Sequence, residues 1–217
     1  METVFKNPYQ NVLETTVRAK RRQGEHLRIE TADTIVPPYR KLHLAPEALS
    51  LDDGVAVTAL DDGALLVPKD YDNETPVLSV PFEARLTLLR NVTARLILTA
   101  IAQTYFSRTP TFDAMSDAPE AFTMTLAGAF LPRDTAPIAA LFLRRSCQWQ
   151  RAGLNIQSDA QKRETTIFGM ATLPWMGPHL FHTAECGVLT SEDVEAAKDA
   201  LHIRFRLNDP VCLSTPL

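Results

Sequence analysis

The chain has 217 residues, of which 45% are hydrophobic and 22% are charged, and it carries a formal net charge of -4 at pH 7. This composition is that of an ordinary folded protein and excludes wholesale disorder, while the mild negative charge argues against a dedicated high-affinity polyanion binder. Every long apolar stretch is interrupted by charge, so we expect no membrane span.

The cysteines and the first ten residues indicate a reducing compartment. The N-terminal segment has no apolar core behind a basic start, which excludes a secretory signal. Cys147, Cys186 and Cys212 are too sparse for a disulfide framework and fit reduced thiols. We therefore expect a cytoplasmic protein without a cofactor. The length fits a single domain over residues 1–217, with 1–108 and 120–217 as an alternative subdivision.

Alternating apolar and polar residues predict strands in the first third of the chain. Residues 11–20 and 26–31 alternate with a period of two, which predicts a hairpin whose tip is basic. Residues 55–60 and 64–68 flank an Asp-Asp-Gly turn and form the clearest hairpin. A short strand at 77–80 follows.

The segment 82–107 is the longest and most regularly apolar stretch. Its apolar residues recur at steps of three and four, which predicts a helix whose circumference is mostly apolar. Because the rest of the helix is a seam of mainly neutral polar groups, we expect it to be covered on nearly all sides. The seam consists of Thr87, Asn91, Arg95, Thr99 and Gln103.

The second half of the chain mixes strand and helix patterns. The predicted elements are a strand at 122–130, a helix at 134–150, a strand at 164–173, a short helix near 191–200 and a strand at 201–207. For residues 138–143 within the predicted helix, a strand is nearly as good an interpretation. The predicted fold is therefore α+β: a mainly antiparallel sheet packed on one long central helix at 82–107, with a second short helix near 191–200. A hot-dog-like fold is a second interpretation, although the predicted strand order around the helix does not match it.

His179, His182 and Cys186 form the best metal-like set. If a helix begins near Pro178, their spacing places all three side chains on one face. Imidazole and thiolate are both good zinc ligands, so a zinc-dependent enzyme is one alternative function. The competing interpretation is a short helix that buries Cys186 while its histidines make ordinary hydrogen bonds.

Other catalytic motifs are weak or missing. Cys147 or Cys186 could act as a nucleophile, but no signature frames either of them, and buried inert thiols are commoner. The glycines form neither a Walker A loop nor a dinucleotide fingerprint. The pairs Asp52-Asp53 and Asp61-Asp62 are turn formers first and cation ligands second. A small-ligand enzyme with a pocket beside the long helix is a further alternative without a named catalytic residue.

Two arginine-rich clusters provide the leading hypothesis. They comprise Arg18, Lys20, Arg21, Arg22 and Arg28 around the first hairpin, and Arg144, Arg145, Trp149 and Arg151 in and just after the predicted helix at 134–150. A cationic ribbon can follow a phosphate backbone, and a tryptophan beside arginines can stack on an unpaired base. Arg204 and Arg206 could extend this surface. The competing interpretation pairs these arginines with acidic residues, which are dense between 46 and 83.

The sequence thus predicts a non-enzymatic cytosolic subunit that contacts RNA or single-stranded DNA through arginines. A basic region beside an acidic one also favours a protein partner or a homo-oligomer. The polar seam of the long helix is a second surface that could face such a partner.

Overall fold

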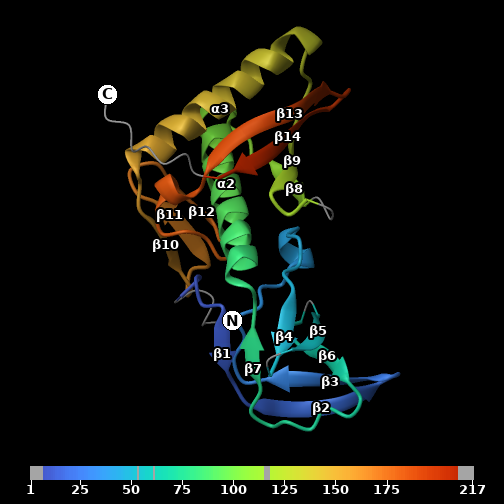
Figure 1. Ribbon diagram of the computed structural model, residues 1–217. Helices are drawn as coiled ribbons and strands as arrows, with labels where there is room; N and C mark the ends of the chain where they lie inside the picture. Colours follow the sequence, from blue (N-terminus) through green and yellow to red (C-terminus); the bar gives the residue numbers. More distant parts are fainter. Residues whose placement is uncertain (1–6, 53, 61, 115–117, 210–217) are drawn as a thin grey trace. The chain divides into compact units, whose positions relative to one another are not determined.

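The computed structural model describes residues 7–52, 54–60, 62–114 and 118–209 (Figure 1). Asp53, Asp61 and Cys212 lie outside these residues. So do residues 1–6, which are most of the N-terminal segment that the sequence analysis compared with a secretory signal. The α+β class is confirmed, because mainly antiparallel sheets accompany one long and one shorter helix. The chain forms two compact units, residues 1–88 (unit 1) and 89–217 (unit 2), and the boundary falls inside the long helix α2, Phe82–Phe106.

Unit 1 is built on a seven-stranded antiparallel sheet with the order β1-β7-β4-β5-β6-β3-β2. Its strands are β1 Val12–Glu14, β2 Val17–Gln23, β3 His26–Thr31, β4 Leu49–Leu51, β5 Val55–Ala59, β6 Leu65–Pro68 and β7 Val77–Ser79, with a 3-10 turn η1 at Arg40–Leu42. The predicted hairpins at β2–β3 and β5–β6 are confirmed. The first predicted strand is divided into β1 and β2, which lie at opposite ends of the sheet.

The alternation in β3 and β6 gives the sheet of unit 1 one buried and one exposed face. Ile29 faces Leu65 across the ladder, and both are fully buried. Their neighbours along the strands, Arg28 and Leu66, also face each other but point to the opposite side and are only partly buried. This second side is called the outer face below.

A buried ion pair joins the start of α2 to the segment before β4. Nε of Arg85 lies 2.8 Å from Oε1 of Glu47, and the two side chains are 0% and 2% exposed. Oη of Tyr39 donates to the other oxygen of Glu47 at 2.7 Å, and Arg85 donates to the carbonyl of Ile35 at 2.9 Å. Burial raises the pKa of Glu47, and the charge of Arg85 opposes that rise. Each of the two charged groups therefore stabilises the other in the core, and removing either would leave a buried charge without a partner.

Unit 2 contains two antiparallel sheets and the helix α3, Thr135–Ala152. The four-stranded sheet has the order β13-β14-β9-β8, and the three-stranded sheet has the order β10-β11-β12. Their strands are β8 Thr111–Ala114, β9 Ala121–Ala127, β10 Ile156–Asp159, β11 Glu164–Ile167, β12 Ala171–Pro174, β13 Val188–Ala196 and β14 Ala200–Asn208. Two 3-10 turns, η2 Pro132–Asp134 and η3 Thr183–Glu185, complete the unit.

The middle of α2 is enclosed as predicted, since every residue from Asn91 to Ala102 is buried. The guanidinium of Arg95 lies over the rings of Phe112 and Phe122, 5.6 and 5.2 Å from their centroids. Burial lowers the pKa of Arg95 to about 10, against the opposing charge of Asp113, so the group stays charged at neutral pH. No helix in the described part of the chain is long and apolar enough to cross a membrane.

The polar seam of α2 is used inside unit 2. Nδ2 of Asn91 donates to the carbonyl of Pro119 at 3.0 Å, and the Thr99 hydroxyl donates to the carbonyl of Arg95 at 2.8 Å. Both side chains are buried by their own chain. This part of the seam therefore cannot serve a protein partner, which corrects that expectation.

Secondary structure differs from the prediction most clearly at 191–200. The predicted short helix is wrong, because these residues belong to the hairpin β13–β14. Alanine, glutamate and lysine favour a helix locally, but pairing along the length of β14 prevails over that weak preference. The second helix is α3, which confirms the helical interpretation of 134–150. The strand predicted at 164–173 is two strands, β11 and β12, because the chain turns at Gly169 with φ +77.

We expect Glu47→Ala to lower the free energy of unfolding of unit 1 by about 3–5 kcal/mol, because it leaves a buried guanidinium without its carboxylate. Glu14→Ala removes an exposed carboxylate from β1 and should change stability by about 0.5 kcal/mol at most. Urea denaturation followed by far-UV circular dichroism tests both. Trp149 and Trp175 belong to unit 2, so tryptophan fluorescence would not report on unit 1. Equal stability of the two variants would contradict the structural role of the pair.

Candidate nucleic-acid interface

The hairpin β2–β3 carries the first arginine cluster on an edge of the unit 1 sheet. Its turn is at Gly24, which has φ +61, so Arg21 and Arg22, which the sequence placed in the basic tip between residues 20 and 26, lie on the strand β2. The register shifts between Val17 and Ala19, which makes Arg18 the extra residue of a bulge. Arg18, Arg21 and Arg22 are exposed and form no ion pair with any described residue.

Two members of the first cluster are neutralised by acidic partners. Nζ of Lys20 lies 2.6 Å from Glu74. Arg28 bridges two carboxylates, with Nη2 2.6 Å from Asp62 and Nη1 2.8 Å from Glu30. The hydrogen bond to Asp62 is the main cause that raises the pKa of Arg28. The competing interpretation from sequence therefore holds for these two residues, and three arginines are left to face solvent.

The second cluster lies on α3 and lacks the aromatic platform that was predicted. Trp149 is 7% exposed and is one of the buried residues of the helix. The prediction that its ring stacks on a base is therefore wrong. Arg145 lies over the ring of Tyr105, 5.1 Å from its centroid, and donates to Gln148 at 2.8 Å. Arg144 and Arg151 are exposed. The cluster thus offers two separate cations.

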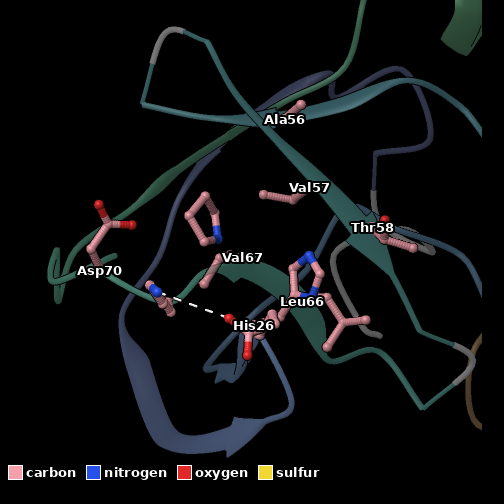
Figure 2. Close-up of a pocket in the computed structure, with 10 residues that line it drawn as sticks. His26, Ala56, Val57, Thr58, Leu66, Val67 and Asp70 are labelled. Carbon is pink, nitrogen blue, oxygen red and sulfur yellow. Dashed lines mark ion pairs between the residues drawn. The ribbon is translucent and has the colours of Figure 1, made fainter.

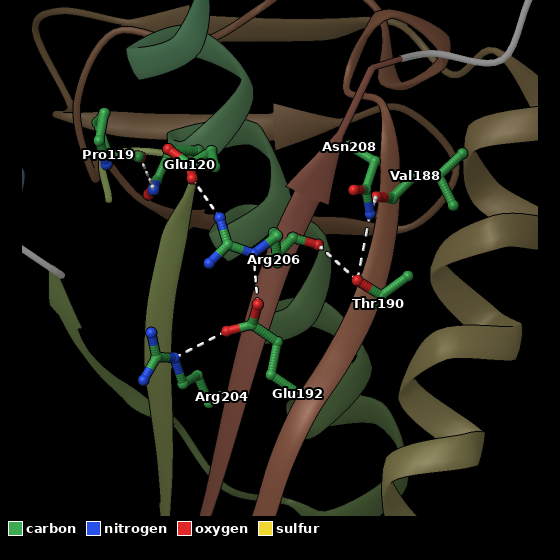
Figure 3. A network of polar contacts seen from close by, with 9 residues as sticks. Pro119, Glu120, Val188, Thr190, Glu192, Arg204, Arg206 and Asn208 are labelled. Carbon is green, nitrogen blue, oxygen red and sulfur yellow. Dashed lines mark hydrogen bonds and ion pairs between the residues drawn. The ribbon is translucent and has the colours of Figure 1, made fainter. Parts of the chain in front are cut away.

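Arg204 and Arg206 are tied into an ion-pair network on the strands β13 and β14 (Figure 3). Nε of Arg204 lies 2.8 Å from Glu192, and Arg206 contacts Glu192 and Glu120. The hydrogen bond from Arg206 is the main cause that holds the pKa of Glu192 below its usual value. These two arginines therefore do not add a free cationic surface.

The residues of the predicted metal site are not brought together. The predicted helix is wrong, because only the short turn η3 forms in this segment. His182 is exposed, whereas Cys186 is fully buried and its thiol donates to the carbonyl of Arg90 at 3.5 Å. Burial raises the pKa of Cys186 to about 12, so it is a neutral thiol at pH 7 and a poor ligand or nucleophile. Within the described ranges, no group of three His, Cys, Asp or Glu residues is placed to hold a metal ion.

His179 has a structural role in unit 2. It is 4% exposed, its Nδ1 lies 2.8 Å from the carbonyl of Leu180, and its Nε2 lies 2.7 Å from Oγ of Ser158. A carbonyl only accepts, so Nδ1 carries the proton and Nε2 accepts from the serine hydroxyl. Burial lowers the pKa of His179, which keeps the ring neutral.

An open pocket of about 440 Å³ lies on the outer face of unit 1 (Figure 2). Its floor is formed by Ala56 and Thr58 of β5 and by Leu66 and Pro68 of β6, with His26 of β3 beside them. Sequence analysis predicted these strands but not the pocket. The sequence did contain a signal for this pocket. The outward residues of β5, Ala56 and Thr58, are small, and they lie beside the larger outward Leu66 of β6, which leaves space above the sheet.

The polar rim of this pocket is held in place by the fold. Asp70 lies at the rim, in the loop that follows β6. Asp52 anchors this loop, because its carboxylate accepts hydrogen bonds from Tyr71 at 2.6 Å and from Asn73 at 3.0 Å. The rim is therefore part of a braced loop.

A second open pocket, of about 530 Å³, lies on β10 and β11 in unit 2 and is lined by Gln157, Thr166 and Phe168 among others. Neither pocket is lined by residues of α2, so the small-ligand hypothesis gains no support from either of them. No protein-family model matches the sequence, and no curated protein matches it either.

The neutral state of His179 predicts a specific pH dependence. Its pKa in the folded state is lower than the value of about 6.5 expected when unfolded, so its contribution to stability is complete above that pH and is lost as the pH falls. Between pH 7 and pH 5, the free energy of unfolding of unit 2 should fall by at most about 1.4 kcal/mol per pH unit. His179→Asn should remove this dependence and His182→Asn should keep it. Denaturation followed by tryptophan fluorescence measures both, and a slope that persists in His179→Asn would contradict the assignment.

Proposed function

We propose that this chain is a non-enzymatic cytosolic subunit that contacts single-stranded RNA or DNA through the hairpin β2–β3 of unit 1. One observation carries the proposal: Arg18, Arg21 and Arg22 are exposed and unpaired among the described residues, while Lys20 and Arg28 beside them are neutralised. A cation that already has a carboxylate partner gains little from a phosphate, whereas a solvated guanidinium can bind one with two hydrogen bonds.

The negative net charge of the chain does not oppose such binding at physiological salt. The Debye length is then about 8 Å, so carboxylates beyond that distance are largely screened from a phosphate bound at β2. The carboxylates of Glu30, Asp62 and Glu74 form ion pairs with Arg28 and Lys20, and Glu25 in the β2–β3 turn lies 3.9 Å from Lys69. The three exposed arginines are therefore the cations of this edge strand that have no carboxylate partner among the described residues.

A single strand suits this edge because the cations lie on one strand. From Arg18 to Arg22 the backbone of β2 advances about 13 Å. Arg21 faces Arg28 on the outer face, whereas Arg22 faces Leu27 and points to the opposite side of the sheet. Because β2 is an edge strand, both long side chains border the same edge, so a polyanion bound along it contacts up to three guanidiniums, which predicts weak and salt-sensitive binding. Assembly with a protein partner or a second copy of the chain stays a prediction from the uneven charge along the sequence.

The salt dependence of binding tests the proposal. With three phosphate contacts, the logarithm of the binding constant should fall with a slope of about -2 against the logarithm of the salt concentration, which is roughly a fifteenfold loss between 50 and 200 mM. Fluorescence anisotropy with a labelled fifteen-nucleotide single strand measures this slope. Binding that ignores salt, or no binding at low salt, would contradict the proposal.

Charge reversal locates the interface. Arg21→Glu with Arg22→Glu should lower affinity by about tenfold or more at low salt and reduce the slope to about -0.7, because one contact is left. Arg144→Glu with Arg151→Glu changes the net charge by the same amount on exposed positions of α3 and is the matched control. An equal loss in both double variants would show that overall charge, and not β2, determines binding. Circular dichroism checks that each variant is folded.

A further inference from the structure

We propose that the open pocket on the outer face of unit 1 binds one unpaired nucleobase of the strand whose phosphates contact β2. This inference rests on the proposed function and adds a base-binding site to it. The pocket and the free arginines belong to the same sheet, and the register of the strands determines how they lie relative to each other.

The strand register places Arg21 and the pocket on the same face. Arg21 faces Arg28 across β2 and β3, Arg28 faces Leu66 across β3 and β6, and Leu66 faces Thr58 across β6 and β5. Residues that face each other directly in a sheet point to the same side. With strands about 4.8 Å apart, Arg21 and Leu66 are separated by about 10 Å. A long arginine side chain can therefore hold a phosphate while the attached base lies over Leu66.

The chemistry of the pocket fits a flat group with an apolar face and a polar edge. Leu66 and Pro68 supply apolar surface, and the imidazole of His26 supplies a ring beside them (Figure 2). Thr58 and Asp70 add a hydroxyl and a carboxylate at the margin, where Glu25 and Lys69 also lie and form an ion pair at 3.9 Å. The carboxylate of Glu25 is therefore occupied by Lys69, whereas no ion pair is formed by Asp70 with another described residue. The volume of about 440 Å³ is within the usual range for small-ligand sites, and the pocket is open to solvent, which suits a base that stays attached to its strand.

Asp70 gives the pocket a preference among bases. An ionised carboxylate only accepts hydrogen bonds, so it favours a base edge with adjacent N–H donors. Guanine presents two such donors on its Watson–Crick edge, whereas thymine presents one donor between two carbonyl oxygens. The proposed ligand is therefore an unpaired guanine-type base within a single strand.

The test uses the full chain and three fifteen-nucleotide strands of identical phosphate content. One is entirely abasic, one carries a single central guanine, and one carries a single central thymine. Wild-type protein should bind the guanine strand about fivefold more tightly than the abasic strand, by analogy with the stacking of one base. Thymine should fall between them. Equal affinity for all three strands would overturn the inference.

Ala56→Leu fills the floor of the pocket from an exposed strand position and should reduce the guanine-to-abasic ratio to about one without changing affinity for the abasic strand. Ala48→Leu makes the same change at an exposed alanine of unit 1 that does not line the pocket, and it should keep the ratio. Asp70→Ala should make guanine and thymine equivalent. A ratio that Ala56→Leu leaves intact would place the base elsewhere.

The two proposals fail in different ways. If no strand binds wild-type protein at low salt, both the proposed function and the base site are wrong. If Arg21→Glu with Arg22→Glu weakens binding of all strands while the guanine-to-abasic ratio of wild type is one, the arginine interface stands and the base site alone is wrong.

Discussion

The burial of charged groups is the constraint on which this structure depends. Arg85 and Arg95 both lie on α2 and are almost completely enclosed, one beside Glu47 and the other against two phenylalanine rings. A guanidinium cannot be deprotonated cheaply, so each must have its compensation built into the core. The enclosed helix is therefore stable only when the segments that supply those partners are folded around it.

The ion pairs and ring contacts of the arginines also determine which guanidinium groups are available to a ligand. Arg28, Arg204 and Arg206 have carboxylate partners, and Arg145 is engaged with Tyr105. On the edge strand β2 of unit 1, Arg18, Arg21 and Arg22 are exposed and have no carboxylate partner among the described residues. An edge strand with exposed cations also resists pairing with other sheets, so these residues have a structural use as well. The proposed base site in the neighbouring pocket would separate binding from simple protection of an edge, because edge protection alone does not require a pocket.

Sequence periodicity predicted most helices and strands correctly, but it did not predict which distant residues they contact. The helix α2 and the hairpins β2–β3 and β5–β6 follow from local pattern, because apolar spacing and turn glycines are properties of adjacent residues. The segment 191–200 was predicted as a helix from its alanine, glutamate and lysine content, but it forms a hairpin whose second strand, β14, also pairs with β9, about 80 residues earlier in the chain. Similarly, the burial of Trp149 and the ion pairs of Arg28 and Arg206 depend on residues distant in sequence. Both arginine clusters were visible in the sequence, but which arginines are free was not.

Crosslinking gives the most direct test of the central claim that a single strand lies along β2 and over the outer face of unit 1. A single-stranded oligonucleotide with a photoreactive base can be irradiated with the full chain at low salt, and the crosslinked peptides identified by mass spectrometry. We predict crosslinks within β2, β3, β5 and β6, and few in α3 or β14. Crosslinks confined to unit 2, or spread evenly over the chain, would contradict the account.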